Sequence, residues 1–151
     1  MICKITKKII KPFMSFGQMP IANGFLKKKY FKKEFLFKME VGFSKDISLF
    51  QLNEHPKPTL MFNKNYPFFT SSSKYMIKHF KGYSKWIKKY YYKNTKNIIE
   101  IGSNDGTFLK NFKSNKTNIL GIEPSRNVAL IAKKIKLILL TNFLLSKLRK
   151  I

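Results

Sequence analysis

The chain has 151 residues, of which 44% are hydrophobic and 15% aromatic, so its composition excludes a disordered protein and suits one ordinary domain or two small ones. Lysine and arginine number 31 against seven acidic residues, and the net charge of +24 points to nucleic acid or another polyanion as a partner. All but two of these basic residues are lysine, however, a skew typical of A/T-rich codons. It favours a solvated basic surface over a dedicated nucleic-acid groove, although non-specific polyanion binding is expected.

The single cysteine, Cys3, excludes an intrachain disulfide and a multi-cysteine metal site within one chain. The N-terminal segment 1–13 lacks the apolar core and cleavage site of a signal peptide. The aliphatic run 137–140 is far shorter than the ~20 residues that a membrane helix needs. We therefore expect a soluble cytoplasmic protein that does not enter a membrane.

The first part of the chain, residues 1–55, predicts a small, loop-rich unit. Its apolar pieces are short, and they are separated by the turn-rich stretch 16–24 and by runs of lysine. The apolar segments 35–43 and 47–52 predict two strands.

Residues 56–93 predict a linker followed by one long amphipathic helix. Prolines oppose regular structure at the start of this zone, and the stretch "TSSS" then offers Ser72 or Ser73 as the helix N-cap. Five apolar side chains recur at steps of three and four and form one stripe, which we expect to pack against a sheet with Trp86 at its edge: Met76, Phe80, Tyr83, Ile87 and Tyr90.

Residues 94–151 alternate between strand and helix patterns, as α/β proteins do. Strands are predicted over 97–101, 118–123 and 137–140, with a short helix over 106–113 and a longer one over 126–136 that Ser125 caps. Right-handed crossovers would place the loops after the first two strands at one edge of a parallel sheet. Ligands of such sheets bind at the carboxyl ends of the strands.

Two glycines and three acidic residues lie at those predicted carboxyl ends. Gly102 and Gly106 allow a sharp turn and the close approach of a ligand. Their spacing, with acids beside it, fits neither a dinucleotide fingerprint nor a phosphate loop. Glu100, Asp105 and Glu123 instead suit an ammonium group and a ribose diol, which S-adenosylmethionine offers and NAD and ATP match less well. The alternative is that the glycines form only a turn and Glu123 is a solvated strand end.

Five stretches in order along the chain resemble one family. They are "GQMPIANGFL", "FSKDISLFQL", "SSSKYMIKHF", "IIEIGSNDGTFL" and "GIEPSRNVALIA". Together they are similar to the bacterial sugar C-methyltransferases that depend on S-adenosylmethionine and act on nucleotide-activated deoxy sugars. The resemblance implies a small zinc-binding-type domain, a linking helix and a partial Rossmann-like methyltransferase sheet, within an overall α/β class.

The resemblance also implies roles for individual residues. The methionine end of the cofactor would be lined by Glu100, Gly102, Ser103, Asn104, Asp105 and Gly106, and the ribose and adenine end by Glu123 and Pro124. Tyr66, Ser71, Ser72 and His79 match a family segment that borders the cofactor and sugar pocket, and Ser71 and Ser72 would contact the cofactor. Tyr66 and His79 are the catalytic candidates, although a histidine at this helical position is more often partly exposed than catalytic.

The chain departs from the family at the zinc site. The family has two C-x-x-C pairs, but here the first pair is Cys3 with Thr6, and Ser44 and Ile47 stand where the second is expected. Because tetrahedral zinc needs four good ligands, we expect no structural zinc, and residues 1–55 would depend on apolar packing or be loose.

The second departure is length, because the family continues beyond the third predicted strand into its catalytic part. An incomplete sheet would leave an exposed edge and an uncovered apolar face. Two classes of function therefore remain open. One is a methyltransferase that needs a completing polypeptide and a nucleotide-sugar substrate; the other is a non-catalytic remnant that binds polyanions or a partner protein through its basic surface. A methyltransferase acting on RNA is a further variant, which the charge permits but no base-stacking or arginine-rich motif supports.

Overall fold

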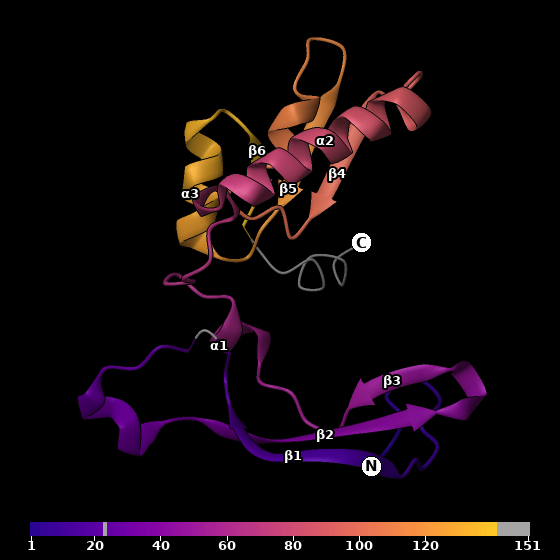
Figure 1. The fold of residues 1–151 in the computed structure, drawn as a ribbon, viewed down its shortest axis with the longest axis vertical. Coiled ribbons are helices and arrows are strands. Elements are labelled where there is room, and N and C mark those ends of the chain that lie inside the picture. The colour runs from indigo at the N-terminus through magenta and orange to yellow at the C-terminus, as the bar shows by residue number, and fades with distance from the viewer. Residues whose placement is uncertain (23, 142–151) are drawn as a thin grey trace. The chain divides into compact units, whose positions relative to one another are not determined.

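The computed structural model describes residues 1–22 and 24–141, and the chain divides into two compact units (Figure 1). The N-terminal unit is Met1–Met61 and the C-terminal unit is Phe62–Ile151. The long helix expected within residues 56–93 belongs to the C-terminal unit, together with the strands that follow it. Residues 142–151, the end of the region 94–151 for which an α/β pattern is predicted, lie outside the described part of the chain.

The N-terminal unit is built on a three-stranded antiparallel sheet in the order β1-β2-β3. Its strands are β1 (Pro12–Pro20), β2 (Leu36–Ser44) and β3 (Leu49–Leu52). The strands predicted over 35–43 and 47–52 are confirmed as β2 and β3. The short helices of this unit are η1 (Lys28–Lys33), η2 (Lys45–Ile47) and α1 (Pro58–Met61).

Strand β1 extends to Pro20, into the first part of the stretch 16–24 that the sequence pattern predicts to be a break. Gly17 has φ of +71°, and the pairing with β2 shifts register between Ser15 and Gln18. A β-bulge therefore accommodates the glycine inside the strand, so the pairing continues to Pro20.

The C-terminal unit contains a parallel three-stranded sheet, as predicted, and its strand order is β4-β5-β6. Its strands are β4 (Asn97–Ile101), β5 (Asn118–Ile122) and β6 (Ile138–Leu140), and its α-helices are α2 (Lys74–Tyr91) and α3 (Arg126–Lys134). The 3-10 turn η3 (Thr70–Ser72) precedes α2. The fold is thus mixed α/β with a partial Rossmann-like sheet. No helix in the described part of the chain is long and apolar enough to cross a bilayer.

The short helix predicted over 106–113 is only a 3-10 turn, η4 (Leu109–Phe112). The side chain of Asn111 donates hydrogen bonds to the carbonyls of Thr107 and Phe108, at 3.0 and 2.9 Å. Because the Thr107 carbonyl is an acceptor that an α-helix would use for its own backbone, this side chain competes with the regular helical pattern.

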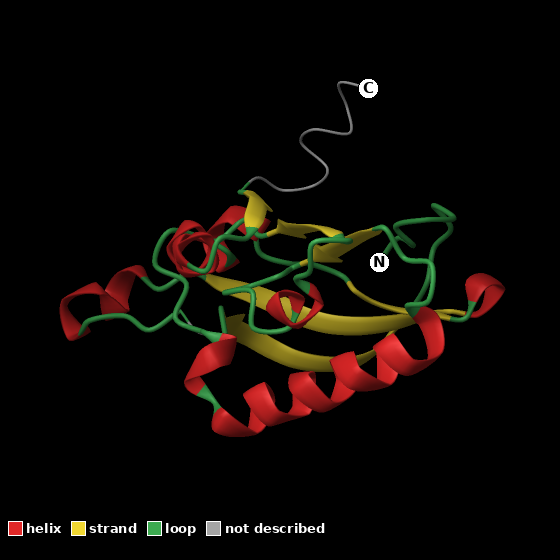
Figure 2. Ribbon diagram, turned by 90° about the horizontal axis from the view of Figure 1, so that it is seen from above, coloured by secondary structure: helices red, strands yellow, loops and turns green. Residues whose placement is uncertain are grey.

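Helix α2, the longest helix in Figure 2, begins as predicted. The Ser73 hydroxyl accepts a hydrogen bond from the backbone N–H of Met76 at 3.3 Å, so Ser73 is the N-cap. The predicted apolar stripe is only half packed. Phe80 and Tyr83 both lie against Phe108, although Tyr83 remains 44% exposed, and Tyr90 is 58% exposed.

The core of the C-terminal unit lies on one face of its sheet. Leu109, Ala132 and Leu137 form its buried centre, and partly buried Ile98, Ile119 and Leu139 pack against them. On the strands, three isoleucine side chains are largely exposed, Ile99, Ile101 and Ile138, at 61%, 67% and 70%. The apolar face that was expected to be uncovered is therefore exposed.

Candidate functional site

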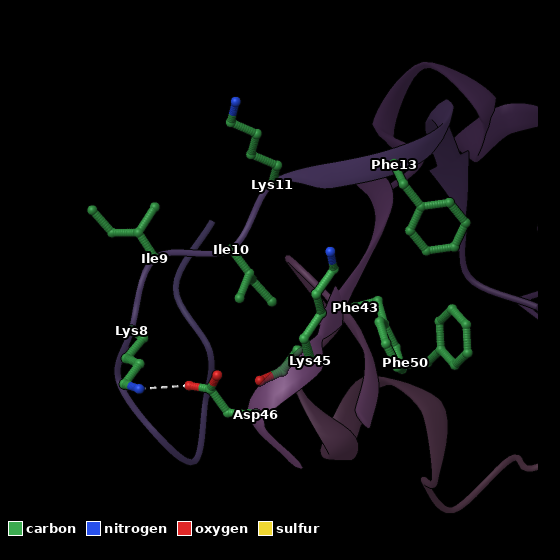
Figure 3. Close-up of a pocket in the computed structure, with 10 residues that line it drawn as sticks. Lys8, Ile9, Ile10, Lys11, Phe13, Phe43, Lys45, Asp46 and Phe50 are labelled. Carbon is green, nitrogen blue, oxygen red and sulfur yellow. Dashed lines mark ion pairs between the residues drawn. The ribbon is translucent and has the colours of Figure 1, made fainter. Parts of the chain in front are cut away.

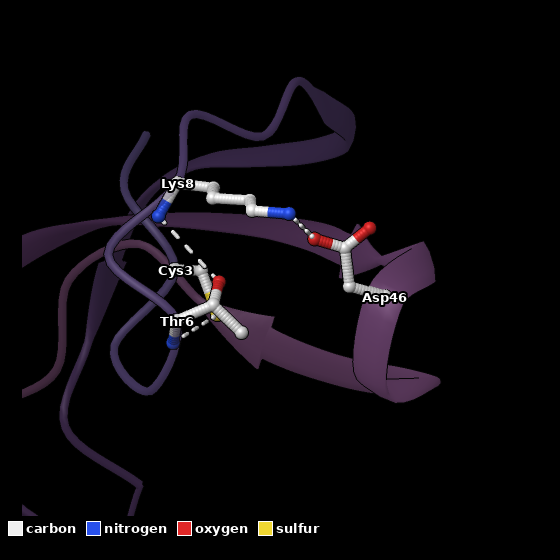
Figure 4. A network of polar contacts seen from close by, with 4 residues as sticks. All are labelled: Cys3, Thr6, Lys8 and Asp46. Atoms are coloured by element: carbon white, nitrogen blue, oxygen red, sulfur yellow. Dashed lines mark hydrogen bonds and ion pairs between the residues drawn. The ribbon is translucent and has the colours of Figure 1, made fainter.

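In the N-terminal unit, Cys3 lies in a turn where its buried sulfur accepts hydrogen bonds. Its sulfur accepts hydrogen bonds from the backbone N–H of Thr6 at 3.4 Å and from the side-chain amide of Gln51 at 3.2 Å. Hydrogen bonds from the Thr6 and Gln51 side chains and the Thr6 N–H lower the pKa of the Cys3 thiol to about 6. Figure 4 shows this turn and the nearby ion pair between Lys8 Nζ and Asp46 Oδ2, at 2.7 Å.

These residues do not fit zinc. Cys3 is the chain's only thiol, and the other positions that correspond to family ligands hold two hydroxyls and an alkyl group: Thr6, Ser44 and Ile47. Within the described residues, no group of three or more His, Cys, Asp or Glu side chains is placed to hold a metal ion. The connection between the N-terminal loop and the β2–β3 turn is made by the Gln51 and Lys8 contacts instead.

A pocket of about 670 Å³ lies between residues 8–11 of the N-terminal loop and the β2–β3 connection (Figure 3). Aromatic side chains of three strands and several lysines line it, with Phe13 56% and Phe50 63% exposed. The rings of Phe43 and Phe50 lie 4.7 Å apart. The lining residues are Lys8, Ile9, Ile10, Lys11, Phe13, Phe43, Ser44, Lys45, Asp46 and Phe50.

In the C-terminal unit, the loop between β4 and η4 contains the predicted cofactor residues. Because β4 and β5 are parallel neighbours with Ile101 opposite Ile122, this loop and Glu123 meet at the same edge of the sheet. Gly102 has φ of +74°, and nothing lies within 4 Å of the position where a Cβ would be. Gly106 has φ of +77°, and a Cβ there would collide with Leu137. Gly102 is therefore open to a ligand, whereas Gly106 is required for packing.

Side chains of the β4–η4 loop form hydrogen bonds with the segment that precedes α2. Asn104 Oδ1 accepts hydrogen bonds from the N–H and the hydroxyl of Thr70, at 2.9 and 3.2 Å, and its amide donates to the Phe68 carbonyl at 3.2 Å. Asp105 Oδ2 accepts from the backbone N–H of Ser71 at 2.8 Å. The structure therefore brings the Ser71 backbone to the loop, whereas the Ser72 hydroxyl closes its own turn on the Phe69 carbonyl at 2.7 Å.

The Asp105 carboxylate is buried but well supplied with donors. Its other oxygen accepts from the N–H and the hydroxyl of Thr107, at 3.2 and 2.7 Å. Burial raises the pKa of Asp105, but the hydrogen bonds from Thr107 and Ser71 outweigh it and hold the pKa below its usual value. Asp105 is therefore an ionised residue that orders the loop.

Glu123 is 4% exposed and joins the loop to the end of β5. Its carboxylate accepts from the backbone N–H of Asn104 at 3.0 Å and, through the other oxygen, from that of Ser125 at 2.7 Å. Glu123 is thus not a solvated strand end. Since a carboxylate offers about four acceptor positions, two remain for other donors. Pro124, which follows Glu123 in the chain, is partly buried.

Four buried oxygens around this edge have no hydrogen-bond partner among the described residues: Glu100 Oε2, Ser103 Oγ, Ser125 Oγ and Asn127 Oδ1. Burial raises the pKa of Glu100 to about 7, the negative charge of Asp105 adds to this rise, and a hydrogen bond from the backbone of Leu109 opposes it. Unpaired buried polar atoms are uncommon in folded proteins, so their concentration here marks an edge suited to a polar ligand.

The two catalytic candidates lie in different surroundings. Tyr66 is partly buried, its ring packs on Phe62, and its backbone carbonyl accepts from the Asn127 amide at 2.7 Å, which links it to the start of α3. His79 is exposed on α2, where its ring contacts are Phe80 and Tyr83.

Sequence reasoning missed three residues of this edge, Thr70, Thr107 and Asn127. It predicted Ser125 only as a helix cap, but Ser125 occupies the N-cap position of α3 without a side-chain capping bond, and its hydroxyl is unpaired. The family-like stretches contain Ser125 and Asn127, so their polarity beside Glu123 was an available signal. Thr70 gave no such signal, because its partner Asn104 is distant in the sequence.

Comparison with known families gives one match. Residues 2–62 match the family model Methyltransf_13, described as a putative zinc binding domain. No curated protein matches the chain. The match relates the chain to methyltransferases through its N-terminal unit, and it ends before the loop of the C-terminal unit that contains Gly102.

Proposed function

We propose that the C-terminal unit binds S-adenosylmethionine at the edge formed by the β4–η4 loop and the end of β5. We further propose that the chain functions as a methyltransferase. The observation that carries this proposal is the open Gly102 between two parallel strands, with Glu123 at the end of the second strand. Such an edge is where ligands of parallel α/β sheets bind.

The residues present fit the chemical groups of this cofactor. Ser103 and Ser125 offer unpaired hydroxyls, and Glu100 and Asn127 offer unpaired oxygens that can accept from an ammonium group or a ribose hydroxyl. Glu123 would hold the ribose through its two remaining acceptor positions. When bound, the cofactor would supply a methyl group on a sulfonium centre.

The substrate class follows from the resemblance described above, which implies a nucleotide-activated deoxy sugar methylated at carbon. Removal of a proton next to a keto group would be needed, and Tyr66 and His79 remain the candidates within the chain for contacts to the sugar.

The test is calorimetric titration of S-adenosylhomocysteine into the full chain at about 150 mM salt, where non-specific charge effects are screened. Gly102→Asn is the decisive variant, because Asn tolerates a positive φ but places a side chain in the space left open for the ligand. Gly17→Asn is its matched control, since Gly17 has φ of +71° and equally open surroundings in the N-terminal unit. We expect saturable binding that Gly102→Asn weakens at least about tenfold, or by ~1.4 kcal/mol, and that Gly17→Asn leaves unchanged.

Glu123→Ala is less decisive, because Glu123 also holds the loop through Asn104 and Ser125. It should weaken binding and lower stability together. Absence of binding by the folded wild-type chain would contradict the proposal, and equal weakening by Gly17→Asn would show that the effect is not local to the loop.

A further inference from the structure

Helix α2 exposes a row of aromatic side chains that borders its packed face, where both Phe80 and Tyr83 contact Phe108. Tyr75, His79, Tyr83, Trp86 and Tyr90 follow one another at steps of four, four, three and four, so they share one face of the helix. Tyr75 is 87% exposed and Trp86 is 47% exposed. Partly buried Phe80 and buried Ser84 lie on the other side.

The rings of this aromatic row are arranged as a stack. The rings of His79 and Tyr83 are 6.2 Å apart with 20° between their planes, and those of Tyr83 and Trp86 are 5.8 Å apart with 16° between theirs. Tyr90 continues the row at 5.6 Å from Trp86 in a tilted arrangement. The Tyr83 ring is also stacked on Phe108, at 5.5 Å and 15°, so Tyr83 anchors the row, whereas Tyr75 and Trp86 are its exposed rings at 87% and 47%.

A groove of about 560 Å³ lies along the row, lined by Tyr75, Lys78, His79, Gly82, Tyr83 and Trp86. Gly82 leaves its floor open, because nothing lies within 4 Å of the position where a Cβ would be. A glycine in a helix interior lowers helix stability by ~1 kcal/mol relative to alanine. At position 82 it leaves room beside Tyr75 and Trp86 for a flat group.

Lysines flank the aromatic row along one side. Lys78, Lys85 and Lys89 follow at steps of seven and four, and each is exposed. The whole stretch 55–99 contains no acidic residue, so no carboxylate of this stretch neutralises them. The Lys88 amine is engaged elsewhere, with the Asn111 carbonyl.

We propose that this face of α2 binds single-stranded nucleic acid, with bases against the aromatic row and phosphates against Lys78, Lys85 and Lys89. Exposed aromatic faces beside cations are the combination that binds unpaired strands, since every base has a face that can stack. In a duplex these faces are already stacked on neighbouring bases, which leaves only the phosphates to contact. Because stacking uses a face that every base has, the binding is tolerant of base sequence.

Trp86 is the only tryptophan in the chain, so its fluorescence reports on this face alone. We would titrate the full chain at about 150 mM salt with a dT 12-mer, the same strand as a duplex, polyphosphate of equal charge, and dTMP. The expected result is quenching that saturates with the 12-mer at concentrations at least about tenfold lower than with the other three.

Two pairs of variants separate stacking from charge, measured by anisotropy of a labelled 12-mer. Trp86→Leu and Tyr75→Leu remove rings without changing charge, and Tyr75, at 87% exposed, has little part in the fold. Each should weaken binding of the 12-mer about five- to tenfold and leave polyphosphate binding unchanged. The triple change Lys78→Gln, Lys85→Gln and Lys89→Gln should weaken the 12-mer more than its matched control, Lys110→Gln, Lys116→Gln and Lys134→Gln.

Equal binding of the 12-mer and polyphosphate, with no effect of either ring removal, would overturn the proposal in favour of charge alone. Tight binding of dTMP would also overturn it and point to a nucleotide-sugar site. Preference for the duplex, or equal losses in the two lysine triples, would contradict the placement on α2. These outcomes do not depend on S-adenosylhomocysteine binding, so the two proposals fail separately.

Discussion

Glu100 is the residue of the candidate site whose ionisation its surroundings change most. Its pKa is about 7 in the folded protein, against an ordinary value of 4.5. Because the folded pKa lies above the unfolded one, the folded protein retains a proton that the unfolded chain releases. The contribution of Glu100 to stability therefore falls as the pH rises from about 4.5 to 7, and the full penalty is present above that window.

Glu100→Gln should remove this penalty, because a neutral amide resembles the protonated acid and keeps an oxygen that can accept from Leu109. A shift of this size corresponds to at most about 3 kcal/mol, and partial solvation of the side chain lowers the expected effect to about 2 kcal/mol. Urea unfolding should show equal stability of the variant and wild type near pH 4 and a more stable variant near pH 8. A constant difference across the pH range would mean that the change acts by packing and not by ionisation.

At the scale of elements, side chains of the β4–η4 loop connect the sheet to the segment before α2 through hydrogen bonds. Asn104 is in the left-handed region, with φ of 49°, and makes three hydrogen bonds to Thr70 and Phe68. Asn104→Gly keeps the backbone conformation accessible and removes these bonds. The free energy of unfolding should fall by about 1 to 2 kcal/mol, and amide hydrogen exchange should accelerate at Thr70 while the β4–β5 amides stay protected. Loss of protection throughout the sheet would contradict this local role.

The sequence predicted the elements whose signals are local. β4 and β5 are continuous apolar runs, and α2 has both a serine cap and helical periodicity, so their positions could be predicted within a residue or two. β1 was missed because Gly17 and two prolines resemble a turn, whereas pairing with β2 and a bulge accommodate them. The hydrogen bonds of Asn104 and Asp105 could not be predicted, since their partners lie 34 residues away and leave no periodic pattern.

At the scale of the whole molecule, the two units are stabilised by different means. The C-terminal unit has an apolar core around Leu109, Ala132 and Leu137, whereas Cys3 and Phe37 are the buried hydrophobic side chains of the described N-terminal unit. The N-terminal unit relies on pairing between strands and on the contacts of Cys3 with Gln51 and of Lys8 with Asp46. A match to a zinc-binding family without zinc ligands is consistent with this thin core.

Restoring the cysteines should therefore stabilise the N-terminal unit selectively. The triple variant Thr6→Cys, Ser44→Cys and Ile47→Cys, together with Cys3, supplies four thiolates in two C-x-x-C pairs, the ligand set of structural zinc. Zinc at ~1,000 times its dissociation constant should stabilise this unit by about 4 kcal/mol, and a chelator should reverse the effect. Hydrogen exchange would localise the gain to residues 1–61, with the β4–β6 sheet as the internal reference. Thr6→Cys alone, which gives only two thiolates, is the control. If the triple variant takes up zinc no better than this control, the turns at residues 3–6 and 44–47 do not converge as the family match implies, and the thin core needs another explanation.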